Sequence, residues 1–267
     1  MLNRIRHINW KNILLGMLWI LCLGGLFTLM SFISVKSSEL ACRELNILIP
    51  GEQSFVERDD IDRMISQTQG SLEGRTLQSV PLHEIEKELR TNPHIKKGVV
   101  FMDMDGTIHI RIRQREALLR ILSTAGADFY LDTKGRKMPV SLKYAPHVLV
   151  ANGFISEGYD RKKDEAIQTE QVRHLFRTAK FVSADSLWNE QVEQLYVNAE
   201  QDIELVPRVG SQRIVLGDAD SIDRKFRKLE LFYKQVVPRV GWDAYKTVNL
   251  KFANQIVCEK VGQLVIK

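Results

Sequence analysis

Two aspartates, Asp103 and Asp105, are the residues of this chain with the clearest potential for chemistry. They stand two positions apart in Asp-Met-Asp-Gly-Thr, at the end of an apolar stretch that begins at Val99 and is typical of a β-strand. A positioned carboxylate can act as a nucleophile or as a general acid and base. The six histidines lack the spacing of a metal site, and the chain has neither a Gly-x-Ser-x-Gly elbow nor a glycine-rich phosphate loop. Catalysis would therefore depend on the two aspartates.

The aspartate pattern resembles the first motif of haloacid-dehalogenase-like phosphatases. That resemblance implies that Asp103 attacks phosphorus and that Asp105 is the acid and base, with a metal-binding third motif at Gly217-Asp218 and Asp223. However, about a hundred residues precede the motif, where the phosphatase fold would begin with it, and the residues after Thr107 alternate like a strand. Asp-Gly also favours a hairpin turn. We expect Asp103 and Asp105 in a solvated turn and keep a membrane-tethered phosphatase as an alternative.

An uncharged apolar segment runs from Ile13 to Val35. It is long enough to cross a hydrocarbon core of about 30 Å as a helix, and a soluble helix of this length is rarely apolar on every face. A cleaved signal peptide usually has a shorter apolar run, and Ser37-Ser38-Glu39 is a poor cleavage site. We therefore expect a transmembrane helix over residues 13–35.

Charge sets the expected orientation of this anchor. Residues 1–12 carry Arg4, Arg6 and Lys11 and no acid, whereas the residues after the anchor carry both signs. The positive-inside rule then predicts a cytoplasmic tail at residues 1–12, with the rest of the chain outside the cytoplasm. Most of the net charge of +5 lies in this tail, so the near-neutral remainder argues against nucleic acid as a partner.

The first exported module spans residues 40–113. Hydrophobic periodicity and turn residues predict, in order, a strand at Glu44–Pro50, a helix at Val56–Gln67, a helix between Ser79 and Asn92, and a hairpin of strands at Val99–Met104 and Thr107–Arg113. Such an order packs two helices on one face of a small sheet.

The second exported module spans residues 114–267. Strands are expected at Ala117–Leu122, Phe129–Asp132, His147–Ala151, Glu193–Asn198, Asp202–Pro207 and Arg213–Leu216, and amphipathic helices at Glu165–Phe181 and Ser221–Val236. The basic residues of the second helix, Arg224, Lys225, Arg227 and Lys228, are expected on a solvated face. A final strand is expected at Thr247–Lys260, with a bulge at Asn254. Cys42 and Cys258 could form a disulfide in an oxidising compartment, but we expect two separate buried thiols.

The order of the first module, with Asn92–Gly98 and the closing hairpin, resembles a POTRA domain. Three stretches of the second module, Tyr130–Pro139, Asp202–Gly210 and Val248–Val257, are similar to the FtsQ/DivIB family of bacterial cell-division proteins. A POTRA domain directly behind a single anchor is also the arrangement of that family. Residues 151–189 carry no family signature. The expected fold class is α+β: the anchor, a POTRA domain and a mostly antiparallel mixed sheet with helices.

The resemblance implies a non-enzymatic scaffold of the divisome at the septum, with no cofactor and no small-molecule substrate. It also implies that the anchor spans a bacterial inner membrane and that the C-terminal domains lie in the periplasm. The partners of the scaffold would be FtsB/FtsL-type proteins and septal peptidoglycan-synthesis proteins. In the family, the closing strand lies at a sheet edge and accepts a partner strand, so that backbone groups give affinity and alternate side chains give register. The partner-binding residues would be Val248, Leu250, Lys251, Phe252, Ala253, Gln255, Ile256 and Val257. The alternatives are that this strand is interior, or that the chain is another POTRA-bearing envelope assembly or transport factor.

Overall fold

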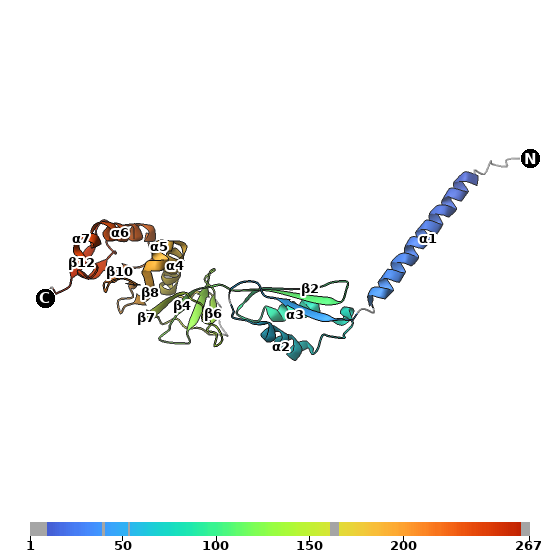
Figure 1. The fold of residues 1–267 in the computed structure, drawn as a ribbon, viewed down its shortest axis with the longest axis horizontal. Helices are drawn as coiled ribbons and strands as arrows, with labels where there is room; N and C mark the ends of the chain where they lie inside the picture. The colour runs from blue at the N-terminus through green and yellow to red at the C-terminus, as the bar shows by residue number, and fades with distance from the viewer. Residues whose placement is uncertain (1–9, 39–40, 53, 161–165, 263–267) are drawn as a thin grey trace, which may run out of the picture. The chain divides into compact units, whose positions relative to one another are not determined.

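The structure is a computed structural model that describes residues 10–38, 41–52, 54–160 and 166–262. The chain divides into two compact units (Figure 1). The first unit holds residues 1–50, 57–91 and 97–112. The second unit holds the residues from Arg113 onward, together with residues 51–56 and 92–96. Cys42 and Cys258 are both free thiols, as expected, but only Cys42 is buried, whereas Cys258 is half-buried.

Helix α1 (Trp10–Ser38) covers the apolar segment near the N-terminus. Its described large apolar side chains, from Leu14 to Leu29, are each at least 56% exposed. Among the described residues, no helix combines the length and the apolar character that crossing a membrane requires. The transmembrane helix expected at residues 13–35 therefore stays a prediction.

The first unit confirms the expected order of strand, helix, helix, strand, strand. Its elements are β1 (Glu44–Leu48), α2 (Arg58–Gln69), a short 3₁₀ turn (Leu77–Ser79), α3 (Leu82–Leu89), β2 (Ile95–Met102) and β3 (Thr107–Gln114). The sheet has the order β1-β3-β2, with β1 parallel to β3.

Alternation along β3 explains how this small unit builds a core. Ile108, Ile110 and Ile112 are fully buried, whereas the alternate residues Arg111 and Arg113 are exposed, because successive side chains of a strand point to opposite faces. Buried apolar residues of both helices complete the core: Ile61, Ile65, Ile85 and Leu89. Leu89 lies so close to β2 that a Cβ on Gly98 would come within 3.0 Å of it.

The second unit is built on a nine-stranded sheet with the order β12-β11-β10-β9-β8-β7-β4-β5-β6. Its strands are β4 (Ala117–Ile121), β5 (Phe129–Asp132), β6 (Lys137–Pro139), β7 (Leu149–Gly153), β8 (Val192–Val197), β9 (Ile203–Pro207), β10 (Arg213–Gly217), β11 (Tyr245–Asn249) and β12 (Val257–Lys260). The pairs β4–β7, β7–β8 and β10–β11 are parallel and the other pairs are antiparallel. The expected meander is confirmed as β8, β9 and β10.

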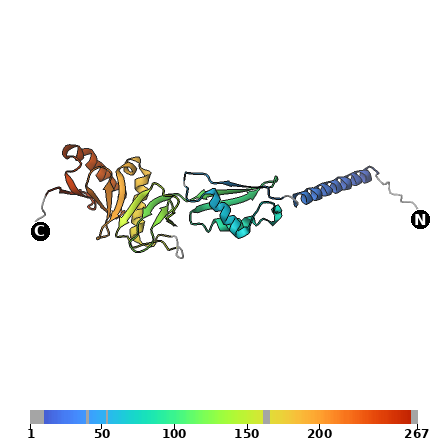
Figure 2. The same ribbon diagram turned by 60° about the horizontal axis from the view of Figure 1, so that its bottom comes forward.

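Four helices supply the other half of the core: α4 (Glu170–Ala184), α5 (Ser186–Gln191), α6 (Ile222–Gln235) and α7 (Val237–Val240). Apolar residues of α4 and α6 pack with the buried residues of the sheet, among them Leu175, Phe226 and Leu229. The last helices and strands, drawn in orange to red, lie side by side in both ribbon views (Figure 2).

The structure corrects the expected start of the first helix of this unit. Helix α4 begins at Glu170 rather than Glu165, because Thr169 caps it: the Thr169 hydroxyl accepts a hydrogen bond from the Val172 N–H at 3.3 Å. The helix then runs on to Ala184, past the expected end. Residues 161–165, including the expected start, lie outside the described residues.

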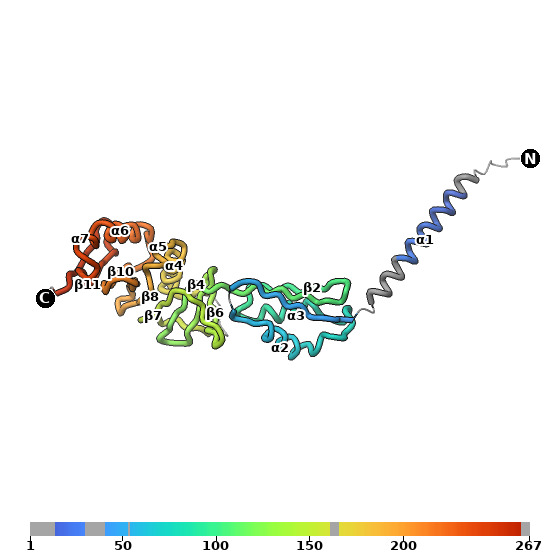
Figure 3. Tube along the Cα trace, in the orientation of Figure 1, coloured from blue at the N-terminus to red at the C-terminus, as the bar shows by residue number. Residues whose placement is uncertain are grey.

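The expected final strand at Thr247–Lys260 is wrong. The chain instead forms two antiparallel strands, β11 and β12, joined by a turn at Ala253-Asn254 (Figure 3 traces this end of the chain in red). Apolar residues stand at the same parity before and after the turn, with Asn254 as the one interruption, so periodicity alone reads the hairpin as one strand with a bulge. Asn254, expected as a bulge, lies in this turn, a position that asparagine favours.

Candidate partner-binding edge

Strand β12 ends the nine-stranded sheet and is paired on one side in the described part of the chain. Its neighbour is β11, with Val248 opposite Cys258 and Asn249 opposite Val257. At the other end of the sheet, β6 pairs with β5, and the neighbouring Arg136 forms a further bridge with Ala166. The outer side of β12 is thus the candidate edge for strand addition.

The direction of the backbone groups on β12 follows from one hydrogen bond at its end. The Val261 N–H donates to the Ala244 carbonyl at 3.2 Å, on the side of β11. Backbone N–H groups alternate in direction along an extended strand of an antiparallel pair. The amide of Glu259 therefore points toward β11, whereas those of Cys258 and Lys260 point outward.

The structure separates the expected partner-binding residues into three groups. Val248 and Leu250 are fully buried in the core, so their side chains are not available to a partner. The residues of the turn, Lys251, Phe252, Ala253 and Gln255, are exposed.

Ile256 and Val257 form the third group, at the start of β12. Ile256 packs against the core, and Val257 is 44% exposed. The expected set omitted Cys258, Glu259 and Lys260, which form the rest of the edge strand. Only the position of the turn would have identified them in the sequence.

Lys251 makes an internal contact rather than pointing freely into solvent. Its ammonium lies 2.6 Å from the Asp202 carboxylate, which precedes β9. Its side chain passes Gly217, where a Cβ would come within 2.9 Å of the Lys251 Cγ. Gly217 also has φ +77°, a conformation that glycine adopts without strain. This ion pair fixes one side of the turn between β11 and β12.

Two lysines of α6 depart from the solvated face expected for them. Lys225 is only 8% exposed, and its ammonium lies 2.6 Å from the Asp218 carboxylate. Burial would raise the pKa of Asp218, but the hydrogen bonds from Lys225 and from the Asp220 N–H outweigh it and lower that pKa. Lys228 donates to backbone carbonyls of the turn between β11 and β12. A helical pattern cannot reveal such contacts, because they depend on which segment packs beside the helix.

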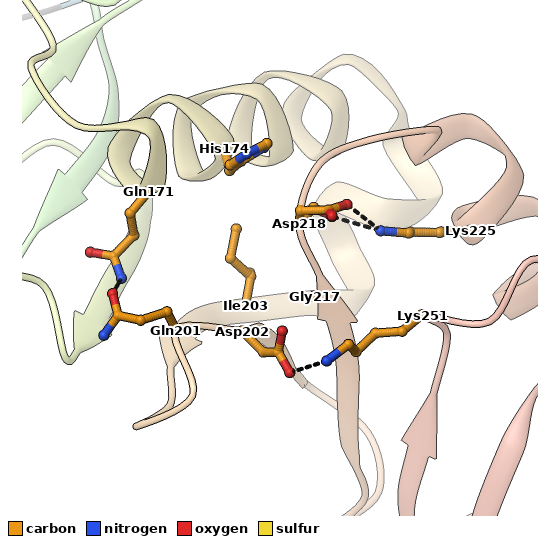
Figure 4. Close-up of a pocket in the computed structure, with 9 residues that line it drawn as sticks. All are labelled: Gln171, His174, Gln201, Asp202, Ile203, Gly217, Asp218, Lys225 and Lys251. Carbon is orange, nitrogen blue, oxygen red and sulfur yellow. Dashed lines mark hydrogen bonds and ion pairs between the residues drawn. The ribbon is translucent and has the colours of Figure 1, made fainter.

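A cavity of about 190 Å³ lies between these ion pairs (Figure 4). Lys225 points toward Asp218 and Lys251 toward Asp202 within it, and the His174 Nδ1 accepts the Ala219 N–H at 3.1 Å. Each carboxylate is already neutralised by a lysine. The arrangement ties β9, β10, α4 and α6 together, which makes it a structural network.

The other chemically suggestive residues form the expected hairpin turn. Asp103–Gly106 connect β2 to β3, and Gly106 has φ +96°. The Asp103 carboxylate lies 2.8 Å from the His109 Nε2. Asp105 accepts the Thr107 N–H at 2.9 Å, and this hydrogen bond lowers the pKa of the Asp105 carboxyl. In the described part of the chain, no group of three or more histidine, cysteine, aspartate or glutamate residues could hold a metal ion.

Comparison with known families is consistent with this division of the chain. Residues 116–259, more than half of the chain, match a family model described as FtsQ/DivIB, C-terminal related. Residues 40–113 match a POTRA-like domain. A search of curated proteins found no match. The first match covers the nine-stranded sheet up to Glu259 in β12, and so includes the candidate edge.

Proposed function

The chain belongs to the FtsQ/DivIB family of bacterial cell-division proteins, and on that basis we propose that it is a non-enzymatic scaffold of the divisome that holds a partner strand along β12. The family implies the role in cell division. The recruitment of a partner, and the place where it binds, are our proposal.

The open outer side of β12 is the observation that carries the proposal. Outward N–H and carbonyl groups of an edge strand can pair with an extended segment of another protein. Exposed apolar side chains flank this edge, with Phe252 46%, Val257 44% and Val261 60% exposed. Strand β12 is short and ends in Lys260, and both features discourage indiscriminate pairing of sheet edges. The edge therefore suits one particular partner strand.

The partner that the family implies is an FtsB/FtsL-type complex, with septal peptidoglycan-synthesis proteins as further neighbours. We propose the inner membrane as the site of action, with residues 13–35 as the single span, the N-terminus in the cytoplasm and the residues after the span in the periplasm. The uncharged apolar run, the exposed apolar side chains of α1 and the basic tail support this topology.

Cell fractionation tests the topology. The chain should stay with the membrane after an alkaline wash, and protease added to spheroplasts should digest the C-terminal units. Release of intact protein by the wash would contradict the anchor.

Depletion in the source bacterium tests the function. Depleted cells should grow into filaments without septa, and the wild-type gene should restore division. Normal septation would rule out the scaffold role. Co-purification with outer-membrane barrel proteins, in place of FtsB/FtsL-type proteins, would instead favour a POTRA-bearing assembly factor.

A further inference from the structure

Lys228 on α6 reaches across to the segment that joins β11 and β12. Its Nζ donates to the Leu250 carbonyl at 2.9 Å and to the Gln255 carbonyl at 3.4 Å, and it also donates to the Phe252 carbonyl. A lysine ammonium has three N–H donors and no acceptor. The three carbonyls thus use every donor that Lys228 has.

The contacts of Lys228 extend over the exposed part of the turn between β11 and β12. The start of the segment is fixed, because the Leu250 N–H donates to the Val215 carbonyl at 2.8 Å and Lys251 is paired with Asp202. The residues that follow, 252–255, are exposed. The register of a hairpin depends on its turn, and β12 begins at Val257, two residues after the last carbonyl that Lys228 binds.

The surroundings of Lys228 disfavour its charged form unless hydrogen-bond acceptors compensate. Burial lowers the pKa of Lys228, and the nearby Lys225 and Arg224 lower it further. Hydrogen bonds to the charged form act in the opposite direction. The nearby Asp218 carboxylate is already paired with Lys225. The turn carbonyls are therefore the partners that offset the unfavourable surroundings of the Lys228 ammonium.

We propose that Lys228 is a positioning residue for partner capture: it holds the turn in the shape that presents the outer side of β12. This inference rests on the proposed function of β12 as an acceptor edge. Lys228 itself makes no contact with the partner strand. Its effect passes through the turn to β12.

The test compares Lys228→Met with Lys234→Met in the full-length protein. Both lysines lie on α6, but Lys234 is exposed and pairs with Glu230 on the same helix. Without any partner, Lys228→Met should speed hydrogen exchange about tenfold or more at the β12 amide of Glu259, which points toward β11, since hydrogen bonds to a charged group are lost. Exchange in the central strands β9 and β10 should stay at the wild-type rate.

Capture is then measured with the purified FtsB/FtsL-type complex of the same bacterium. Lys228→Met should weaken it about tenfold, Lys228→Arg should restore part of it because the guanidinium also donates to carbonyls, and Lys234→Met should match the wild type. If Lys228→Met unfolds the whole unit, seen as fast exchange in β9 and β10, Lys228→Gln takes its place.

Two results would overturn the inference: unchanged exchange in β12, or faster exchange with unchanged capture. Failure of the wild-type protein itself to capture the complex would instead overturn the proposed function. The exchange measurement without a partner keeps the two failures apart.

Discussion

The ammonium of Lys137 lies 2.7 Å from the Glu157 carboxylate, and neither side chain is more than 3% exposed. Glu157 also accepts the backbone N–H groups of Gln168 at 2.9 Å and Thr169 at 2.8 Å, at the start of α4. Burial would raise the pKa of Glu157, but the hydrogen bonds from Lys137 and Thr169 outweigh it and lower that pKa. One buried ion pair thus joins strand β6 to the beginning of α4.

Lys137→Met should lower the free energy of unfolding by about 3–5 kcal/mol, because it leaves the Glu157 charge buried without its partner. Urea unfolding followed by tryptophan fluorescence measures this, since Trp188 is buried in the same unit. Lys134→Met, at an exposed position of the neighbouring turn, is the matched control and should change the value by less than about 0.5 kcal/mol. Equal effects of the two variants would contradict the importance of the pair.

His94 should make folding sensitive to mild acid. Burial, assisted by the charge of Arg115, lowers the pKa of His94 from 6.5 to about 4. The unfolded chain takes up this proton near pH 6.5 and the folded chain only near pH 4, so the free energy of unfolding should fall as the pH drops through this window. His94→Phe keeps a ring to stack on Phe55, whose centroid lies 5.0 Å away, and removes the proton. Urea unfolding between pH 6.5 and 5 should give a smaller slope for this variant; an unchanged slope would disprove the assignment.

Proline substitutions at two positions of β12 should distinguish its outward amides, which a partner would use, from its inward amides, which pair with β11. Lys260→Pro removes an outward amide, so it should weaken capture of the FtsB/FtsL-type complex with little change in stability. Glu259→Pro removes an amide that points toward β11, and it should cost about 1 kcal/mol or more. Binding assays and urea unfolding of both variants provide the comparison. If Lys260→Pro captured its partner like the wild type, the outer side of β12 would not be the binding edge.

Gly153→Ala should be more harmful than a substitution at another glycine with positive φ. Gly153 has φ +98°, and a Cβ there would lie 2.2 Å from the Val197 carbonyl of the paired strand β8, whereas Gly241 has φ +83° and open space. Backbone strain alone costs roughly 1–3 kcal/mol. Gly153→Ala should therefore lower the free energy of unfolding more than Gly241→Ala does. Equal losses would mean that the close approach of Gly153 to the Val197 carbonyl is unimportant.

Local patterns were sufficient for much of the fold. The alternation of Ile108, Ile110 and Ile112 and the turn at Asp105-Gly106 identify the POTRA hairpin, because strand period and turn chemistry depend only on neighbouring residues. The irregularity at Asn254 was expected as a bulge and not as a turn, since the apolar residues keep the same parity on both sides of it. The sequence also did not predict that Lys228 of α6 is bonded and not solvated, because it reaches carbonyls more than twenty residues away in the chain. Contacts of this kind depend on tertiary packing rather than on local sequence.

Amide-resolved hydrogen exchange of the full-length protein, with and without the purified FtsB/FtsL-type complex, tests the central claim most directly. We expect the outward amides of Cys258 and Lys260 to become protected in the complex, while the amides of β6 at the opposite end of the sheet keep their rates. Equal exchange of Cys258 and Lys260 in the presence and absence of the complex, with protection elsewhere, would contradict strand addition at β12.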